Sequence, residues 1–237
     1  MKTVELTAGG AQLDELYRNV LLPSFPSDEL TSLESLRDGV RDGSTRAVAV
    51  VDDDGRVVAG SVGEWSPSCR VMLLAYFAVT GPFRGTGIGG SLYTEAIGGW
   101  RKEYAPCLIL AEVEHPGHHA GTTAHGDPGA RLRFYGRLGA RVLALPYFQP
   151  ALGPGRSRVY GMLLLALHVD AELAGPGGPD TVAAEPLRAF LTEYWELAEG
   201  GVGKDPATTA LWQALAAEQG VPALPADRFA EVPVTLA

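Results

Sequence analysis

Hydrophobic residues in the first 169 positions of the chain follow the spacings of strands and of amphipathic helices. Runs that are apolar at alternate or at successive positions predict seven strands, over residues 3–8, 46–51, 56–65, 72–79, 106–114, 141–147 and 158–167. Apolar residues three and four apart predict helices over residues 12–22, 28–40, 89–103 and 130–138. Together these elements are enough for one sizeable core that mixes helices and strands.

Three local signals refine this picture. The three aspartates before Gly55 are typical of a hairpin turn, so strands two to four are expected to be consecutive and antiparallel. The run 72–79 is apolar apart from the hydroxyl of Tyr76, which is typical of a central strand buried on both faces. Two prolines end the first helix, and Ser27 or Asp28 is the expected cap of the second.

The last part of the chain, residues 170–237, has a different character. Its Gly- and Pro-rich stretch at 174–179 is typical of a linker, and apolar residues at helical spacing follow over 181–199 and 206–219. They are expected to pack on the core or on a second subunit, as in a homodimer. The segment carries 11 acidic and 3 basic residues, a net charge of −8 out of −9 for the whole chain. This excess is either a solvated helical surface or a face that attracts a cationic substrate.

Composition and charge disfavour several classes of protein. The 237 residues are 46% hydrophobic, yet no apolar run approaches the roughly 20 residues that span a bilayer. The first residues lack the basic and then apolar pattern of a secretory signal, so a cytoplasmic protein is expected. Cys69 and Cys107 do not make a disulfide framework and are expected to be buried thiols. The net charge of −9 disfavours nucleic acid and anionic membranes as partners.

The most informative stretch is the loop between a predicted strand and helix, with four glycines in the six residues from Gly85 to Gly90. Glycine lets the backbone approach a ligand and adopt positive φ, and a helix start offers unpaired N–H groups. With Arg84 at its entrance, the loop is predicted to bind a phosphate or pyrophosphate. Two alternatives stay open: the G-x-G-x-x-G fingerprint of dinucleotide-binding enzymes, which residues 85–90 match literally, and a tight turn without a ligand.

Two motifs in this order resemble the GNAT superfamily of acyl-CoA-dependent N-acyltransferases. The first is Arg84-x-x-Gly87-x-Gly89 after a strand that ends in Ala78-Val79, and the second is Phe134-Tyr135-x-x-x-Gly139 before a strand. The resemblance covers residues 1–169. It implies an α+β fold with a mixed, largely antiparallel central sheet of about seven strands flanked by helices, and it leaves residues 170–237 as a helical C-terminal extension.

The cofactor implied by the resemblance is acetyl-CoA, with its pyrophosphate on the loop amides and its pantetheine on strand amides near Phe77 and Val79. The expected cofactor-binding residues are Phe77, Ala78, Val79, Arg84, Gly85, Thr86, Gly87, Ile88, Gly89, Gly90 and Ser91. By the same resemblance, the hydroxyl of Tyr135 faces the departing thiolate and acts as general acid. The alternative is that this ring only packs on an amphipathic helix.

A pair of carboxylates at the end of a strand is the second candidate for chemistry. Alternation along the strand at 106–114 places Glu112 and Glu114 on one face, about 6.6 Å apart. Charges on an apolar strand need water, a partner or a substrate. In the resembled fold this strand splays from the one before it and the acyl group sits in the gap, so either glutamate would bind the acceptor amine or accept its proton. A salt-bridged pair without a catalytic role is the alternative.

Three further residues are candidate contacts to the acceptor. Phe25 lies in the loop between the first two helices, which often borders the acceptor in the resembled superfamily. Tyr147 ends the sixth predicted strand, and Gln149 follows it. Four histidines in the segment 115–125 invite a metal hypothesis, but flexible Gly, Thr and Ala surround them without the spacing of zinc ligands. We expect no metal there and a loop that borders the acceptor.

The sequence therefore predicts an N-acetyltransferase that moves an acetyl group from acetyl-CoA to a primary amine by direct attack. The acidic segment and the glutamate pair favour a small-molecule amine as acceptor. A protein or peptide acceptor is the alternative within the enzyme class. An acyl-CoA-binding sensor or interaction module without turnover, and a dinucleotide oxidoreductase, are the alternatives outside it.

Overall fold

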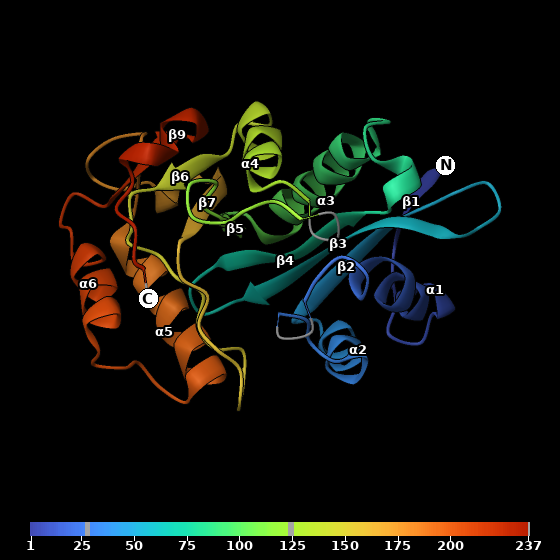
Figure 1. Ribbon diagram of the computed structural model, residues 1–237, viewed down its shortest axis with the longest axis horizontal. Helices are drawn as coiled ribbons and strands as arrows, with labels where there is room; N and C mark the ends of the chain where they lie inside the picture. The colour runs from blue at the N-terminus through green and yellow to red at the C-terminus, as the bar shows by residue number, and fades with distance from the viewer. Residues whose placement is uncertain (27–28, 123–125, 237) are drawn as a thin grey trace. The chain divides into compact units, whose positions relative to one another are not determined.

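The computed structural model describes residues 1–26, 29–122 and 126–236 (Figure 1). The chain forms two compact units. Unit 1 consists of Met1–Ser66 and Met72–Ala105, and unit 2 consists of Pro67–Val71 and Pro106–Ala237. Each unit has its own strands and helices, so each is described by itself.

In unit 1, four strands lie in the order in which they occur along the chain. They are β1 (Lys2–Glu5), β2 (Thr45–Val51), β3 (Val57–Ser66) and β4 (Val71–Val79), the last of which enters the unit at Met72. β1 pairs with β2, and β2 with β3, in antiparallel register. Asp52 accepts hydrogen bonds from the amides of Asp54 and Arg56, and Gly55 has a φ of 83°, so the predicted hairpin is confirmed.

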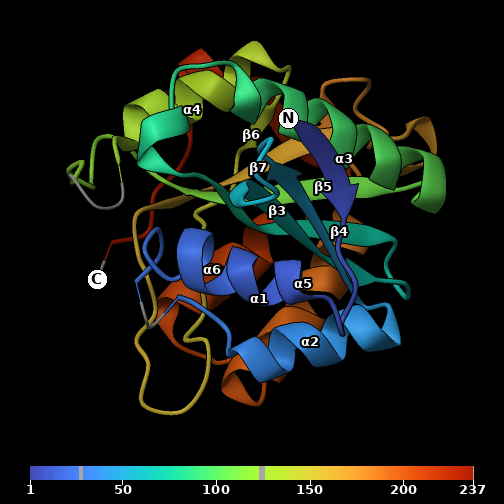
Figure 2. The same cartoon turned by 90° about the vertical axis from the view of Figure 1, so that its right-hand side faces the viewer.

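Helices cover both faces of these strands, with α1 and α2 on one face and α3 on the other (Figure 2). Their bounds are α1 (Ala11–Glu15), which continues as the π-helix η1 (Leu16–Leu21), α2 (Leu33–Asp42) and α3 (Ile88–Tyr104). Tyr76 and Ala78 of β4 pack in the cluster that holds the side chains of α1 and η1. Phe77 and Val79 pack instead in the cluster that holds Leu92 of α3. β4 thus has apolar contacts on both faces, as its unbroken hydrophobic run predicted.

The second helix begins later than its sequence pattern predicted. The predicted caps, Ser27 and Asp28, lie outside the described residues, and α2 starts after Ser32, whose hydroxyl oxygen accepts a hydrogen bond from an amide of the first turn. The hydroxyl of Tyr76 explains the delay. It hydrogen bonds to the backbone at both ends of the segment 29–31 and so holds that segment outside the helix.

In unit 2, five strands lie in the order β5-β7-β6-β9-β8, and neighbours pair in antiparallel register. Their bounds are β5 (Leu108–Glu114), β6 (Arg141–Leu143), β7 (Met162–Val169), β8 (Thr181–Val182) and β9 (Val221–Pro225). The helices are α4 (Pro128–Arg137), α5 (Ala184–Glu199) and α6 (Pro206–Ala214), with short 3-10 helices over Ala171–Leu173 and Ala226–Glu231. α4 and α5 lie on opposite faces of β5, β6 and β7 (Figures 1 and 2).

The α+β fold with a largely antiparallel sheet flanked by helices is confirmed, but the described part of the chain has nine strands rather than about seven. The two additional strands, β8 and β9, come from the segment after residue 169, where only helices were expected. β9 contains Pro222 and Pro225, which cannot donate a ladder hydrogen bond, so its sequence does not read as a strand. It nevertheless pairs with β6, which ends at Leu143 and not at Tyr147 as predicted. The domain boundary at residue 169 stays a prediction.

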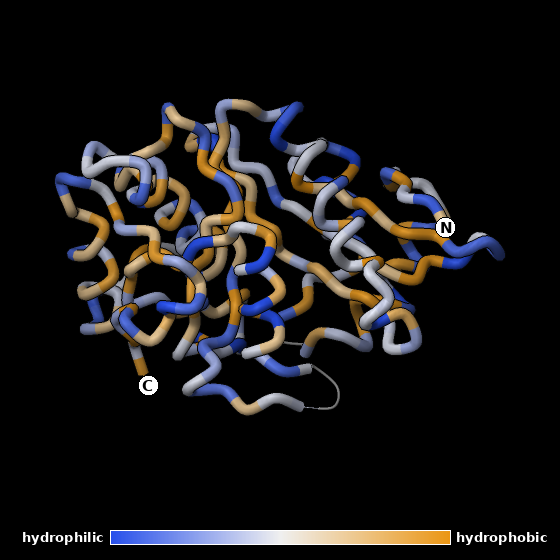
Figure 3. Tube along the Cα trace, turned by 90° about the horizontal axis from the view of Figure 1, so that it is seen from above, coloured by the Kyte–Doolittle hydropathy of each residue, from blue (hydrophilic) through white to orange (hydrophobic). Residues whose placement is uncertain are grey.

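Hydropathy follows this architecture, with hydrophobic stretches along the strands and hydrophilic stretches at turns and loops (Figure 3). Cys69 and Cys107 are buried thiols, as predicted. In the part of the chain that the structure describes, no helix has both the length and the hydropathy needed to cross a membrane.

Trp195 of α5 is the centre of an aromatic core in unit 2. It is completely buried, and its ring meets the rings of Tyr147, Phe148 and Trp212 edge-on at centroid distances of 6.3, 5.4 and 5.3 Å. Aromatic rings bury a large area, and edge-to-face pairs add to that stabilisation. The cluster ties α5 to α6 and to the segment between β6 and β7.

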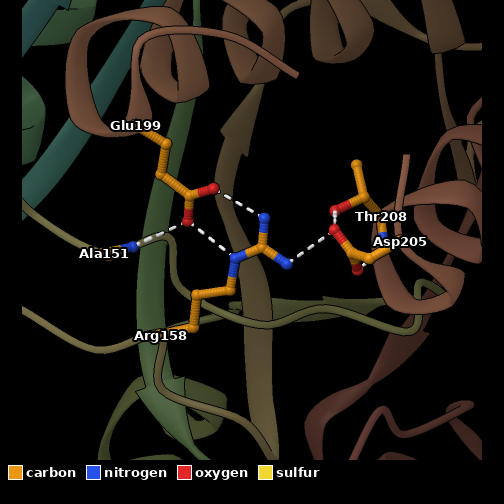
Figure 4. Close-up of polar contacts among 5 residues, drawn as sticks. All are labelled: Ala151, Arg158, Glu199, Asp205 and Thr208. Atoms are coloured by element: carbon orange, nitrogen blue, oxygen red, sulfur yellow. Dashed lines mark hydrogen bonds and ion pairs between the residues drawn. The ribbon is translucent and has the colours of Figure 1, made fainter. Parts of the chain in front are cut away.

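An ion-pair network holds the segment between β6 and β7 on the C-terminal helices (Figure 4). The guanidinium of Arg158 donates two hydrogen bonds to Glu199, at 2.7 and 2.6 Å, and one to Asp205 at 2.9 Å. Glu199 also accepts from the amide of Ala151 at 2.9 Å, and Asp205 caps α6 by accepting from the amide of Thr208 at 3.0 Å. These five residues are called the Arg158 network below.

Both carboxyl groups of the Arg158 network stay ionised to lower pH than usual. Hydrogen bonds from Arg158 lower the pKa of Glu199 against the opposing effect of burial. Burial alone would raise the pKa of Asp205, but hydrogen bonds from Thr208 and Arg158 outweigh it and lower that pKa. A carboxyl group with a lowered pKa stabilises the folded state at pH values above it, so the network contributes to stability near neutral pH.

We predict that Trp195→Ala lowers the free energy of unfolding by about 3 to 5 kcal/mol, because it leaves a cavity in a packed aromatic cluster. Leu197→Ala on the same helix is the matched control. The Leu197 residue is 87% exposed, and truncating its side chain is expected to change stability by less than about 0.5 kcal/mol. Urea unfolding followed by circular dichroism measures both variants, and equal effects would contradict the central position of Trp195.

We predict that Arg158→Met lowers the free energy of unfolding by about 2 kcal/mol at neutral pH, since it leaves two carboxylates without their cationic partner. Because Glu199 and Asp205 have lowered pKa values in the folded protein, the contribution is complete above about pH 5 and is lost as the pH falls through those lowered values. The difference from wild type should therefore shrink in acid. Urea unfolding at neutral pH and at about pH 3 tests this. A difference that grew as the pH fell would contradict an ionic contribution from the network.

Candidate active site

The loop between β4 and α3 has the geometry of an anion site. The chain makes a short 3-10 turn over Gly81–Phe83, and α3 begins at Ile88 with Gly87 as its N-cap. Gly85 and Gly87 have φ values of 78° and 91°, which other residues adopt only with strain. The first N–H groups of a helix have no partner within it, and Gly87 brings no side chain to cap them. The start of α3 therefore presents backbone donors and the positive end of the helix dipole.

Two side chains fix this loop to the residues before it. Nε of Arg84 donates to the carbonyl of Val79 at 3.0 Å, and the hydroxyl of Thr86 donates to the carbonyl of Phe83 at 2.7 Å. Arg84 is exposed, so it adds its charge at the solvent side of the loop. The structure thus brings the predicted cofactor residues 84–91 together at one helix start, directly after those of β4.

Phe25, the predicted acceptor contact of unit 1, packs edge-on against Tyr76 of β4 with ring centroids 5.1 Å apart. It is partly buried against the apolar cluster of α1 and η1. This packing is enough to explain why an aromatic side chain stands at position 25. A contact between Phe25 and an acceptor stays a prediction.

In unit 2 a polar cluster forms around the carboxylate of Glu112 on β5, whose hydrogen bonds with described residues include three from uncharged side chains. The donors are the hydroxyl of Tyr147 at 2.5 Å, the amide of Gln149 at 3.0 Å and the hydroxyl of Tyr194 at 3.3 Å. These four residues are called the Glu112 cluster below. The structure therefore joins one predicted catalytic residue to two predicted acceptor contacts, and adds a residue of α5.

Tyr147 and Gln149 are held firmly in this cluster. Tyr147 is completely buried, and burial together with the charge of Glu112 raises the pKa of its hydroxyl well above the usual value. It therefore stays protonated and donates to Glu112 at neutral pH. Gln149 exchanges two backbone hydrogen bonds with Val159, at 2.9 and 3.0 Å. Glu112 itself is half-buried, so part of its side chain is open to solvent.

Sequence reasoning missed Tyr194 as a functional candidate. Tyr194 lies in the helix predicted over 181–199, where the spacing of apolar residues indicates packing. Its hydroxyl reaches a strand residue 82 positions earlier in the chain, and no spacing in the sequence marks such a contact. Only the packing of α5 against β5 reveals it.

Glu114 has different partners from Glu112. Its carboxylate lies 3.3 Å from Nη1 of Arg131 on α4 and 3.7 Å from Nδ1 of His119. A fixed guanidinium charge therefore opposes the charge of Glu114. Glu114 therefore fits the alternative of a salt-bridged glutamate without a catalytic role. The donors in the Glu112 cluster are uncharged side chains instead.

Tyr135, the predicted general acid, lies on α4 and is almost completely buried, with its ring 5.2 Å from that of Phe134. Gly139 has a φ of 90° where the chain leaves the helix, and the amides of Leu138 and Ala140 both donate to the carbonyl of Tyr135. The left-handed turn at the end of α4 thus explains why the motif has a glycine at position 139. A contact between the Tyr135 hydroxyl and a departing thiolate stays a prediction.

The histidines after β5 take part in structural contacts. His115 is buried and its Nδ1 accepts from the amide of Gly117 at 3.0 Å. Burial lowers the pKa of His115, which favours the neutral ring. Nε2 of His119 lies 2.7 Å from the carbonyl oxygen of Tyr160, and His125 lies outside the described residues.

Among the described residues, one group of metal-ligating side chains converges away from these histidines. Cys107, His168 and Asp170 have ligand atoms within 4.8 Å of one another. Hydrogen bonds account for this group, because Asp170 accepts from the amide of Cys107 at 2.8 Å and lies 2.9 Å from Nε2 of His168. Its role in the fold is to join the start of β5 to the end of β7.

No protein-family model matches the sequence, and no curated protein matches it. Solved structures do match. A structure from Bacteroides thetaiotaomicron that is assigned to the GNAT family of acetyltransferases has a TM-score of 0.58 and 23% sequence identity, over 82% of this chain and 98% of that chain.

Two further structures match with lower scores. A GNAT family acetyltransferase from Elizabethkingia anophelis with acetyl-CoA bound has a TM-score of 0.49 and 18% identity, over 71% of this chain and 97% of that chain. An aminoglycoside 6′-acetyltransferase of type Ii has a TM-score of 0.49 and 17% identity, over 72% of this chain and 99% of that chain. The match to the Bacteroides structure shows that this chain has the fold of the GNAT acetyltransferases.

Proposed function

We propose that this chain is an acyl-CoA-dependent N-acyltransferase that moves an acetyl group from acetyl-CoA to a primary amine of a small molecule. One observation carries the proposal: in a GNAT fold, Gly85 and Gly87 shape an anion site at the start of α3, beside Arg84. A pyrophosphate has the charge that such a helix start binds. The strands before the loop pair in antiparallel register, unlike the parallel strands of a dinucleotide-binding βαβ unit.

In this proposal the residues around the start of α3 hold the cofactor. The amides of residues 87–90 bind the pyrophosphate oxygens, and Arg84 adds a charge-assisted contact. Backbone donors near Phe77 and Val79 hold the pantetheine and stabilise the negative charge that develops on the thioester oxygen. Acetyl-CoA supplies the activated acetyl group, so the protein supplies binding and proton transfer.

Two residues of unit 2 handle the protons. Glu112 accepts a proton from the ammonium form of the acceptor, directly or through water, and so makes the amine nucleophilic. A bond forms between the amine nitrogen and the carbonyl carbon, and the bond between that carbon and sulfur breaks. Tyr135 donates a proton to the leaving sulfur and is restored by the second proton of the attacking nitrogen. The proton on Glu112 then passes to solvent, so one proton is released for each acetyl group transferred.

The partners of the two glutamates favour Glu112 as the base. Arg131 opposes the charge of Glu114, whereas Glu112 accepts hydrogen bonds from Tyr147 and Gln149, two predicted acceptor contacts, which orient its carboxylate. The net charge of −8 on residues 170–237 adds a long-range attraction for a cation. Both observations support a small cationic amine as the acceptor.

We predict that acetyl-CoA binds in a calorimetric titration and that Gly87→Glu weakens the binding at least about tenfold. A carboxylate at this left-handed N-cap opposes the charge of the pyrophosphate and strains the backbone. Gly99→Glu is the matched control, because it adds the same charge at an exposed position of α3 where a Cβ meets no other atom within 4 Å. It should leave the affinity unchanged.

NADH, titrated in parallel, is expected not to bind. If NADH bound and acetyl-CoA did not, the dinucleotide interpretation would replace the proposal. If neither bound, the loop would be a turn without a ligand and the proposed function would be wrong.

We predict that Glu112→Gln lowers kcat/KM for an acceptor amine at least about 100-fold, because it removes the base, whereas Glu114→Gln lowers it less than about fivefold. Spermidine, kanamycin and a lysine-containing peptide serve as acceptor probes, with release of the free thiol as the readout. Acetyl-CoA affinity should be unchanged in both variants.

A larger loss in Glu114→Gln than in Glu112→Gln would move the base to Glu114. Transfer to the peptide alone would favour a protein or peptide acceptor. Binding of acetyl-CoA without transfer to any of the three amines would favour the sensor alternative.

A further inference from the structure

We propose that Tyr194 of α5 is a specificity-determining residue of the acceptor site, where its hydroxyl and ring bind the ammonium group of the acceptor beside Glu112. The inference rests on the proposed N-acyltransferase function. It gives the acidic segment 170–237, which contains α5, a direct part in acceptor recognition. It also narrows the substrate class to small primary amines that are cationic at neutral pH.

The Glu112 cluster offers more acceptor oxygens than its carboxylate alone. A tyrosine hydroxyl that donates its single hydrogen keeps two lone pairs, and a glutamine that donates through its nitrogen keeps its carbonyl oxygen. Tyr147 and Gln149 are buried, whereas Tyr194 is half-buried, so of the three donors Tyr194 lies nearest to solvent beside the carboxylate. An ammonium group has three N–H donors, which the carboxylate of Glu112 and the hydroxyl oxygen of Tyr194 would share in this proposal.

Neighbouring rings fix the orientation of Tyr194. It stacks on Phe190, one turn earlier in α5, with ring centroids 5.8 Å apart at an angle of 25°. It also meets Trp195 edge-on at 5.8 Å, and Trp195 is completely buried. Tyr194 therefore cannot turn away from Glu112 without disturbing packed rings. Tyr194 is half-buried, so part of the residue stays open to solvent, and in this proposal its ring contacts the cation.

The Arg158 network ties the segment that carries Tyr147 and Gln149 to the same helix, because Ala151 and Arg158 of that segment bind Glu199 (Figure 4). Tyr147 and Gln149 stand near the start of the segment between β6 and β7, and Arg158 stands near its end. Arg158 binds Glu199, which lies more than one turn after Tyr194 on α5. One helix therefore positions both Tyr194 and the segment that carries the other two donors. Acceptor recognition is built on α5 as much as on that segment.

Steady-state kinetics of Tyr194→Phe tests the inference, with saturating acetyl-CoA and with spermidine or kanamycin as the varied acceptor. We expect the KM for the amine to rise at least about tenfold, because phenylalanine keeps the ring but removes a hydrogen-bonding oxygen. The KM for acetyl-CoA and the thermal unfolding temperature should not change. Tyr104→Phe is the matched control, since it removes a hydroxyl that accepts a hydrogen bond from Arg46 in unit 1. It should leave both KM values unchanged.

A second variant, Arg158→Lys, tests the positioning role of the Arg158 network. Lysine keeps the charge but cannot make the two parallel hydrogen bonds to Glu199. We expect a higher KM for the amine with an unchanged KM for acetyl-CoA. If both KM values rose by the same factor, the network would be purely structural and its positioning role would be wrong.

The outcomes separate this inference from the function on which it rests. A folded and active Tyr194→Phe enzyme with the wild-type KM for the amine would overturn the inference and leave the N-acyltransferase function in place. A wild-type protein that neither binds acetyl-CoA in calorimetry nor acetylates spermidine, kanamycin or the peptide would overturn the function, and the inference with it.

Discussion

The carboxylate of Glu112 sets the constraint that organises unit 2. A charge on a largely apolar strand has to be hydrogen bonded, since burial without partners costs several kcal/mol. Tyr147, Gln149 and Tyr194 meet that requirement from two different elements. Those donors must themselves be held in place, and Trp195 packs against both tyrosine rings. The polar cluster and the aromatic core of unit 2 are therefore parts of one arrangement.

The anion site proposed in unit 1 is made mainly of backbone amides rather than side chains. The helices α2, α4 and α6 begin with side-chain caps from Ser32, Asp127 and Asp205. Such a cap contributes about 1 kcal/mol but occupies the amides of the first turn. α3 begins with Gly87 and forgoes this stabilisation, which leaves its amides available to an anion. The apolar contacts between Leu92 and β4 hold the helix in place instead.

Features that depend on residues close together in the chain could be predicted from the sequence. The hairpin at Gly55, the apolar strand β4 and the helix after the glycine-rich loop each rest on a local pattern, and the structure has all three. Features that depend on distant contacts could not. β9 is a strand because β6 offers it an edge, although Pro222 argues against a strand, and the segment before Ser32 is not helical because a hydroxyl of β4 binds it.

The candidate site shows the same division between local and distant information. Glu112, Tyr147 and Gln149 are each candidate site residues in the sequence, but nothing in their spacing indicates that they touch. The contact depends on how the segment between β6 and β7 folds over β5, which the aromatic core and the Arg158 network determine. Tyr194 could not be found at all, because a tyrosine on an amphipathic helix is typical of packing.

The cofactor loop and the Glu112 cluster belong to different compact units of the chain. On the functions proposed above, substitutions in α5 change which amine is accepted and leave the helix start that holds the cofactor untouched. A lineage can therefore gain new acceptors by drift in its C-terminal segment while purifying selection preserves the glycine-rich loop. On these proposals, the residues that hold the cofactor and the helix that selects the acceptor can change independently.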